Sequence, residues 1–507
     1  MTEPQLGDSQ VEGAASSVPP DDSDQWRKVH WSTPLVNAWQ ALAAVIVIVL
    51  FNSADWVGDV AEAFELPPVA IIALIVAGAV LLFSAVALVY SYFAWRRIRY
   101  AVSDDAVYYH SGIFLRSQRH ARLNRIQGVD INRPVLGRLV GIAAVVIESA
   151  GGAESKVDVK FLKDDDAEAL RAEILARAAG LSARQESGEA APAFAVAPER
   201  VVYQLEPKTL IGSLLRSGTF YVCVVLAASI IPVALIVQSF SALVGFIPVV
   251  AVGASFIWSR FAGEFGFTLA ISPDGLRTRQ GLLSTRAKTL PPGRIQAISL
   301  TQPYLWRRKD WWRVRINVAG YGLDASGGGD AGSMSIGGVL IPVATRSEAL
   351  NGIWLVLHDL GVDDPQGVID SALSGTLGDG GFLHSPRQAR WVDPIKWRRN
   401  GLLITRTALL MRSGRITRSL AIVPHERTQS LRIDQGPWAR KLGVAAFAVD
   451  SVTGPVVPRV EHLLEMTALQ VLREQSWRAR EARALEGRDE WMLRVGMRAP
   501  EVPGERP

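Results

Sequence analysis

Residues 125–144 read RIQGVDINRPVLGRLVGIAA, and two later segments of the chain follow the same pattern. Residues 294–313 read RIQAISLTQPYLWRRKDWWR, and residues 427–446 read RTQSLRIDQGPWARKLGVAA. The second segment lies 169 residues after the first, and the third lies a further 133 residues along the chain. Self-similarity at a fixed offset is the signature of a repeated structural unit. The sequence therefore predicts three copies of one domain, called copies one, two and three below.

Each copy is predicted to be β structure closed by one helix. In copy one, alternating or β-branched runs at 106–109, 141–149 and 157–161 are bounded by turn residues, as in strands joined by hairpins. A helix follows, with aspartates at 164–166 in its first turn and Gly180 where a C-cap glycine belongs. The corresponding helices are predicted at 346–360 and 459–486. Such a unit is a small, strongly bent β-sandwich or barrel.

A change of hydrophobic phase marks the Arg-Ile-Gln motif. Ile126 and Gly128 share one face of the predicted strand, whereas Val129 and Ile131 share the other, and the later copies repeat this change. One extra residue, a β-bulge, produces such a shift. The motif residues are therefore interpreted as structural, with the glutamines pairing backbone groups at the bulge; a ligand role for the glutamines is the alternative. They are Arg125, Gln127, Arg294, Gln296, Arg427 and Gln429.

Three charge-free runs predict four membrane spans. They cover residues 31–54, 66–95 and 217–259, and about 20 apolar residues cross a bilayer core. The third run is long enough for two helices, near 218–238 and 242–259, which turn at the polar residues 238–241. Buried core helices are the alternative reading of these runs.

Basic residues predict the orientation of the spans. Lys and Arg flank the runs at positions 27, 28, 96, 97, 99, 208, 216 and 260, whereas the loop at 53–66 holds only acidic charges. Positive charges stay on the cytoplasmic side. We therefore expect a multi-pass protein of the cytoplasmic membrane, with both termini and all three domains in the cytoplasm.

Composition narrows the possible functions. The 507 residues are 49% hydrophobic and only 20% charged, which a disordered chain cannot be. One cysteine excludes a disulfide scaffold, and the seven histidines form no metal-binding spacing. No phosphate-binding loop ending in GK[ST] and no catalytic constellation is recognisable, so we expect no cofactor, no metal and no enzymatic activity.

The motif and its membrane context carry a resemblance. A membrane hairpin followed by R-I-Q, a proline step and an R-x-x-G strand resembles the bacterial membrane-flanked, PH-like family (bacterial PH domain 2), over roughly residues 31–475. The resemblance implies a PH-like split barrel attached to the cytoplasmic membrane. Copy three departs from the pattern, because Thr428 replaces the isoleucine and no apolar span precedes it.

The expected fold class is an α+β multi-domain membrane protein with two transmembrane helical hairpins and three PH-like split β-barrels, each with a C-terminal helix. The expected boundaries are a disordered tail at 1–30, hairpin one at 31–95, domain one at 96–182, a linker at 183–207, hairpin two at 208–260, domain two at 261–362, a linker at 363–390, domain three at 391–486 and a charged tail at 487–507.

Two functions fit this organisation. In the first, the protein is a non-enzymatic membrane scaffold whose domains bind a protein partner, another copy of the chain or anionic lipid headgroups. In the second, it is an accessory subunit of a membrane enzyme or transport assembly. The charge-free spans favour the first, because ion-coupled transporters need ionisable groups within the membrane.

Copy two alone has gained basic and aromatic residues after its proline. Trp306, Arg308, Lys309 and Arg313 stand where copy one has the small or aliphatic residues Gly137, Leu139, Val140 and Ala144. Such a mixture suits an anionic membrane surface, and these four residues are the candidate lipid or partner site. The alternative is that the tryptophans fill the domain core or stack on arginines. Nucleic acid is not expected so close to a bilayer.

Overall fold

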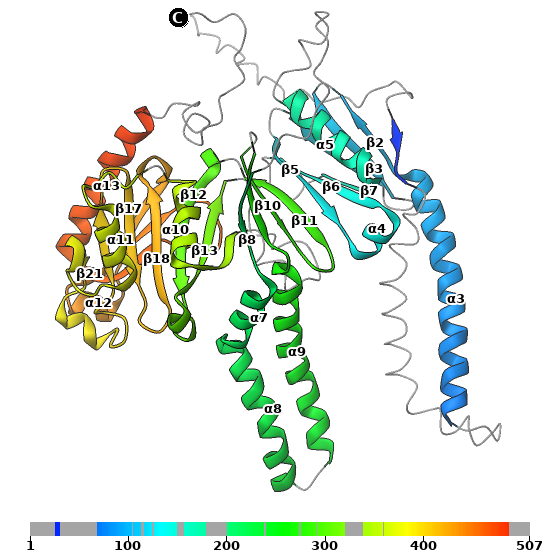
Figure 1. The fold of residues 1–507 in the computed structure, drawn as a ribbon, viewed down its shortest axis with the longest axis horizontal. Helices are drawn as coiled ribbons and strands as arrows, with labels where there is room; N and C mark the ends of the chain where they lie inside the picture. The colour runs from blue at the N-terminus through cyan, green and yellow to red at the C-terminus, as the bar shows by residue number, and fades with distance from the viewer. Residues whose placement is uncertain are drawn as a thin grey trace, which may run out of the picture. The chain divides into compact units, whose positions relative to one another are not determined.

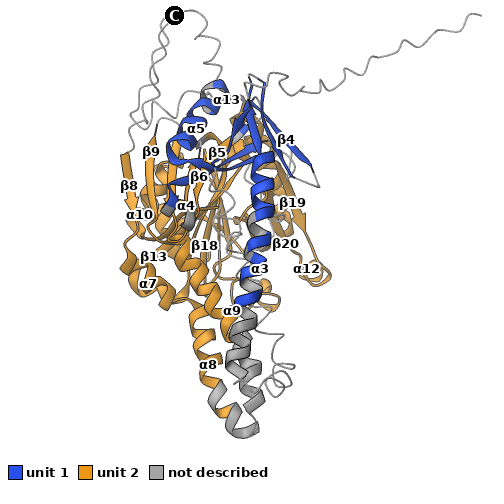
Figure 2. Cartoon of the chain, turned by 90° about the vertical axis from the view of Figure 1, so that its right-hand side faces the viewer, with its two compact units in different colours: residues 1–126, 139–190 blue, residues 127–138, 191–507 orange. Residues whose placement is uncertain are grey.

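The computed structural model describes the chain in segments, at residues 26–30, 68–103, 105–112, 116–123, 126–149, 157–178, 200–237, 240–272, 275–290, 292–319, 338–357 and 359–485. The first predicted span, at 31–54, lies outside them, as do residues 1–25 and 487–507 of the predicted tails and most of the linker at 183–207. Two compact units make up the chain: residues 1–126 with 139–190, and residues 127–138 with 191–507 (Figure 2).

The first unit holds most of copy one. Its antiparallel sheet has the order β1 (Arg27–Lys28), β2 (Arg99–Val102), β3 (Ala106–Ser111) and β4 (Ser117–Arg122). The strands β6 (Ile142–Ser149) and β7 (Val157–Lys163) form an antiparallel pair, and α5 (Asp164–Ala178) follows them. Ala167, Leu170 and Ile174 are buried on one face of α5. The sequence analysis therefore predicted β3, β6, β7 and α5, whereas β1 corrects the prediction of a disordered tail over residues 1–30.

Copies two and three lie in the second unit and repeat the plan (Figure 1). Each has four antiparallel strands, then three more, then a helix. In copy two these are β8 (Arg200–Gln204), β9 (Thr268–Ser272), β10 (Gly275–Gln280), β11 (Thr285–Leu290), β12 (Ile295–Gln302), β13 (Trp311–Val318), β14 (Val339–Thr345) and α10 (Arg346–Trp354). In copy three they are β15 (Leu383–His384), β16 (Gly401–Ile404), β17 (Ala408–Ser413), β18 (Arg418–Pro424), β19 (Ser430–Asp434), β20 (Val444–Asp450), β21 (Arg459–Leu464) and α13 (Glu465–Leu485).

Strands of neighbouring copies pair within the second unit. The strand β5 (Ile126–Arg133), followed by the short helix α4 (Val135–Val140), pairs with β11, and β12 pairs with β18. The β12–β18 pairing makes one seven-stranded sheet from parts of copies two and three. Leu300 of β12 and Leu420 of β18 are opposite each other in this register, and both are completely buried.

The helical hairpin of copy two is inserted inside its domain. α7 (Pro207–Leu215), α8 (Gly218–Val237) and α9 (Phe240–Glu264) run between β8 and β9, which pair antiparallel with each other. In copy one, α3 (Pro68–Arg97) likewise lies between the paired strands β1 and β2. The predicted boundary at 208 therefore needs correction, because the first strand of each of these domains comes before its helices.

Two further differences concern copy three. Residues 363–390 were predicted to be a linker, but they contain α11 (Pro365–Ser374), whose Ile369, Ala372 and Leu373 are buried in the core. Residues 459–464 form β21 rather than the start of a helix. Apolar spacing alone did not separate this strand from the helix α13 that follows it directly.

A test of helix length and hydropathy, applied to the described residues, finds no single helix that could cross a bilayer; α7 and residues 218–229 of α8 pass it together, with a 55° bend at their break.

Candidate functional site at the base of the α8–α9 hairpin

The structure divides the four candidate residues into two buried and two exposed side chains. Trp306 and Arg313 are buried, with exposed fractions of 1% and 7%. Arg308 and Lys309 are exposed at the end of the 3-10 helix η5 (Tyr304–Lys309). The buried pair faces the base of the hairpin and the exposed pair faces solvent, so the two pairs have different roles.

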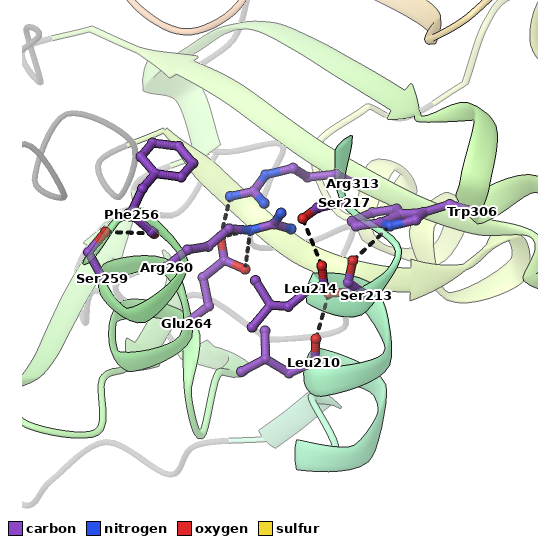
Figure 3. Close-up of polar contacts among 10 residues, drawn as sticks. All are labelled: Leu210, Ser213, Leu214, Ser217, Phe256, Ser259, Arg260, Glu264, Trp306 and Arg313. Atoms are coloured by element: carbon purple, nitrogen blue, oxygen red, sulfur yellow. Dashed lines mark hydrogen bonds and ion pairs between the residues drawn. The ribbon is translucent and has the colours of Figure 1, made fainter. Parts of the chain in front are cut away.

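Trp306 attaches α7 to the copy-two domain. Its Nε1 donates a hydrogen bond of 3.1 Å to the carbonyl oxygen of Ser213, in the last turn of α7 (Figure 3). Carbonyl groups in the last turn of a helix lack partners within the helix, so the indole satisfies one of them. The guanidinium carbon of Arg260 lies 5.6 Å from the centre of the indole ring, within the range of a cation–π contact.

Glu264 attaches α9 to the same domain. This carboxylate is 4% exposed, and both Arg260 of its own helix and Arg313 of β13 form ion pairs with it (Figure 3). The Nε atom of Arg260 lies 3.4 Å from Oε2, and Nη2 of Arg313 donates to Oε1. Because the carboxylate is buried between two cations, this contact holds the end of the hairpin on the sheet.

Arg313 occupies a β-bulge that all three copies share. The register of the last two strands shifts between Ala143 and Val145 in copy one, and at the equivalent positions in copies two and three. The residue inside the bulge is Ala144 in copy one, Arg313 in copy two and Ala446 in copy three. A bulge redirects a side chain, and only copy two uses it to carry a charge.

Trp311 adds a second contact with α7. The guanidinium carbon of Arg216 lies 5.5 Å from the centre of its ring. A Cβ atom built on Gly212 would lie 3.0 Å from the indole, so the glycine allows α7 to approach. Trp312, its neighbour in β13, points the other way into the core and donates to Asp310 at 2.8 Å. The aromatic residues of this segment thus serve packing, as the alternative interpretation had it.

The charge of the cluster is unbalanced. Arg260, Arg313 and Arg315 lie close enough to interact with Glu264, which is the one acidic group among them. Burial and the nearby positive charges of Arg313 and Arg260 lower the pKa of Arg315 to about 10. The base of the hairpin therefore carries a net positive charge at neutral pH.

The exposed residues of η5 belong to a wider basic surface. Arg307 joins η5 to the turn between β17 and β18 by donating to the carbonyl oxygens of Arg415 and Ile416, the latter at 3.0 Å. Arg308, Lys309 and Arg415 are exposed and are called the basic surface below. Tyr304 and Ile416, which are 62% and 63% exposed, add apolar groups beside it.

The Arg-Ile-Gln motif forms the predicted bulge in copy two. The register of β12 against β13 shifts between Ile295 and Ala297, so Gln296 is the extra residue. Its side chain is buried and donates to the carbonyl oxygen of Arg294 at 3.3 Å. The burial of Gln296 at the bulge fits a structural role, but the Arg294 carbonyl oxygen is not left unpaired there, since it also accepts from the N–H of Ala319 at 2.8 Å.

The other two copies of the motif differ in what can be described. Arg125 and the side chain of Gln127 lie outside the described residues. In copy three, Gln429 is exposed and precedes β19, whose described register is continuous, so the interpretation of Gln429 as a bulge residue needs correction. There the buried side chain is Thr428, whose Oγ1 accepts a hydrogen bond of 2.9 Å from Gln475. Arg294 and Arg427 are half-buried in turns before their strands.

Replacing Gln296 with alanine should lower the free energy of unfolding by about 1–3 kcal/mol, because the change removes a buried side chain and one of the two hydrogen bonds that the Arg294 carbonyl oxygen accepts. Chemical denaturation would measure the change. Gln429→Ala is the matched control and should alter stability by less than about 0.5 kcal/mol, since its side chain is exposed. Equal effects of the two changes would contradict the structural role of Gln296.

No group of three His, Cys, Asp or Glu side chains suited to a metal ion occurs among the residues that the structure describes. The single cysteine, Cys223, packs inside the hairpin. A Cβ atom on Gly253 of α9 would lie 2.4 Å from its sulfur atom, so Gly253 is what lets α8 and α9 come together at this level.

The repeated seven-strand domains with a closing helix define a protein built from PH-like modules. A family model described as Bacterial PH domain matches residues 41–178, 223–350 and 389–477, one match for each copy. The chain therefore belongs to the bacterial PH domain family, which confirms the resemblance seen in the sequence. The first two matches include helices of the inserted hairpins, in agreement with the strand pairing around them. No curated protein and no solved structure matches the chain.

Proposed function

We propose that this protein is a non-enzymatic scaffold integrated in the cytoplasmic membrane, whose three PH-like domains face the cytoplasm and bind a protein partner or anionic lipid headgroups. The family itself supports a binding or scaffold role. The proposal of membrane integration is based on the helices that extend from the domains.

The observation that carries the proposal is the exposure of apolar side chains along these helices. Leu81 and Leu82 of α3 are 73% and 70% exposed, and Val225 of α8 and Val252 of α9 are 65% and 69% exposed. Soluble monomers rarely expose contiguous apolar patches larger than a few hundred Å². A bilayer around these helices accounts for side chains that would otherwise face water.

The base of the hairpin supports the same orientation. Arg216 and Arg260 lie where α7 and α9 meet the domain, and two residues of the basic surface, Arg308 and Lys309, lie on η5, the element that also carries Trp306. Basic groups near the cytoplasmic leaflet gain about 1 kcal/mol each from its anionic lipids. This arrangement suits a domain whose hairpin side rests against the headgroups.

Cysteine labelling in intact cells tests the membrane orientation. In a Cys223→Ala background, a membrane-impermeant maleimide should label Asp59→Cys and Ser239→Cys, because these positions lie between predicted spans, on the side without basic residues. Ser430→Cys, an exposed position of copy three, should react only after the cells are permeabilised. Labelling of Ser430→Cys in intact cells, or labelling of Asp59→Cys and Ser239→Cys only after permeabilisation, would overturn the orientation.

Lipid contact by the basic surface is tested with the full chain in nanodiscs. An environment-sensitive fluorophore on Ile416→Cys in the Cys223→Ala background should shift its emission to shorter wavelength in phosphatidylglycerol discs compared with phosphatidylcholine discs. Replacing Arg308, Lys309 and Arg415 with glutamine should abolish the shift, and added salt should weaken it, since about 3 kcal/mol of attraction is removed or screened.

The control variant for that experiment removes three positive charges at positions outside the basic surface. Arg440, Arg473 and Arg480 are exposed residues outside the basic surface, and their replacement with glutamine should leave the shift intact. A shift that disappears equally in both triple variants, or that ignores salt, would exclude the basic surface as the lipid contact.

A further inference from the structure

Neighbouring copies in the chain are joined by one strand pairing that occurs twice. In the first pairing, Arg133 of β5 is opposite Thr285 of β11. In the second, Gln302 of β12 is opposite Arg418 of β18. Position 302 is 133 plus 169, and position 418 is 285 plus 133. These two offsets are the ones that relate copy one to copy two and copy two to copy three. The two junctions therefore have the same register, residue for residue.

The first and last copies each leave one strand of this junction at the end of a sheet. β4 is the copy-one equivalent of β11 and β18, and it is the last strand in the order β1-β2-β3-β4. β19 is the copy-three equivalent of β5 and β12, and it is the first strand in the order β19-β20-β21. In the described part of the chain, β4 and β19 thus stand at opposite ends of the series of copies.

Burial shows that the β19 edge is incomplete. Val129 and Ile131 of β5 are 2% and 4% exposed. Their equivalents in β12, Ile298 and Leu300, are completely buried. The equivalents in β19, Leu431 and Ile433, remain half-buried although both pack against the copy-three core. The same apolar positions are less covered in copy three, whose β19 is paired with no strand of another copy in the part of the chain that the structure describes.

Charge at the two strands is compatible with their pairing. β4 reads SQRHAR and is basic. On β19, Arg432 lies 3.6 Å from Asp434 and 3.5 Å from Asp450, so its positive charge is already compensated by two carboxylates. In the register of the internal junctions, Arg119 of a second β4 lies directly opposite Arg432, a like-charged pair whose cost these two carboxylates offset, and diagonally to Asp434, where opposite charges attract.

We propose that β19 of one molecule pairs antiparallel with β4 of a second copy of this chain, in the register of the two internal junctions. Asp434 is then opposite Ser117, Ile433 opposite Gln118, and Leu431 opposite His120. This is β-strand addition between identical chains, and it covers the apolar side chains that β19 leaves half-exposed. The contact is head-to-tail, so each added copy again presents one β4 and one β19, and assembly continues into a ring or a filament. It goes beyond the scaffold function and does not depend on membrane insertion.

Cysteine cross-linking of the full-length, detergent-solubilised protein tests the pairing and its register. In a Cys223→Ala background, mild oxidation of the double variant Ser117→Cys/Asp434→Cys should give a ladder of dimers, trimers and higher species. Paired Cα atoms at this spacing can form a disulfide. The matched control, Ser117→Cys/Ile433→Cys, displaces one cysteine by a single residue to the other face of the strand and should give at least tenfold less product.

The single variants and a mass measurement complete the test. After oxidation, Ser117→Cys or Asp434→Cys alone should give only the single-chain band on a non-reducing denaturing gel, and cross-linked dimers from either one would mean symmetric edge pairing and overturn the proposal. Light scattering should give at least twice the chain mass of 55.0 kDa for the unmodified protein and one chain mass for Ile433→Lys, whose circular dichroism spectrum should show that the β structure is retained. A monomeric unmodified protein, or equal ladders from the matched and displaced pairs, would also overturn it.

Discussion

Replacing Glu264 with alanine is expected to lower the free energy of unfolding of the copy-two domain by about 3–5 kcal/mol, because the change leaves buried cations without their counter-ion. Glu264 accepts from Arg313 and lies 3.4 Å from Nε of Arg260. Arg313 is 7% exposed, so water cannot replace the lost carboxylate without opening the contact between α9 and β13.

Denaturation of the full chain in detergent, followed by near-ultraviolet circular dichroism, measures this effect. The double variant Glu264→Ala/Arg313→Ala, measured together with Arg313→Ala alone, is the informative control, since it removes both members of this ion pair and places at position 313 the alanine that copies one and three carry in the same bulge. It should be more stable than Glu264→Ala, with a coupling of about 0.5–3 kcal/mol between the two sites. Additive losses would mean that the ion pair does not hold α9 on the sheet.

The repeated plan could be predicted from sequence because its signals are local. The Arg-Ile-Gln motif recurs with constant spacing, and the phase change around Gln296 indicates a bulge that β12 does contain. The acidic first turn and apolar face of α5 likewise predict a helix with the observed bounds. Each of these features depends on residues within one or two elements of each other.

The insertion of the hairpin could not be predicted in the same way. β8 is only five residues long and ends two residues before α7, and the 63 residues that separate it from its partner β9 are mostly those of α7, α8 and α9. β15 has two residues, which no periodicity reveals. Strands this short are stabilised by their neighbours in the sheet, so sequence analysis assigned them to linkers.

The charged residues of copy two were recognised by composition, but their roles depend on distant partners. Arg313 and Arg308 look alike in sequence, yet one meets Glu264, 49 residues away, and the other faces solvent. The bulge that turns Arg313 inward is common to all three copies. It could not be recognised from the sequence, because copies one and three have only an alanine at this position, Ala144 and Ala446. Only the pairing of β13 with β14 shows where that side chain points.

Trp306→Ala should destabilise the copy-two domain by a similar amount, about 3–5 kcal/mol, because a fully buried indole leaves a large cavity when it is truncated. Trp306 is 1% exposed and belongs to the main core of copy two. The change also removes the donor to the Ser213 carbonyl oxygen and the ring beneath Arg260. Both ends of the hairpin base would therefore loosen together.

Two further variants separate the contributions to the stability that Trp306→Ala loses. Trp306→Phe keeps most of the apolar contact and removes the hydrogen-bond donor, so it should cost about 1–3 kcal/mol. Trp311→Ala removes a half-buried ring that contacts Arg216 and should cost less than Trp306→Ala. Denaturation midpoints in detergent rank the three variants. If Trp306→Ala lowered the stability no more than Trp311→Ala does, Trp306 would not be the residue that fixes α7 to the domain. The reason is that truncating Trp306 leaves both an unpaired carbonyl group and an empty indole site, and each of these costs stability in a packed core.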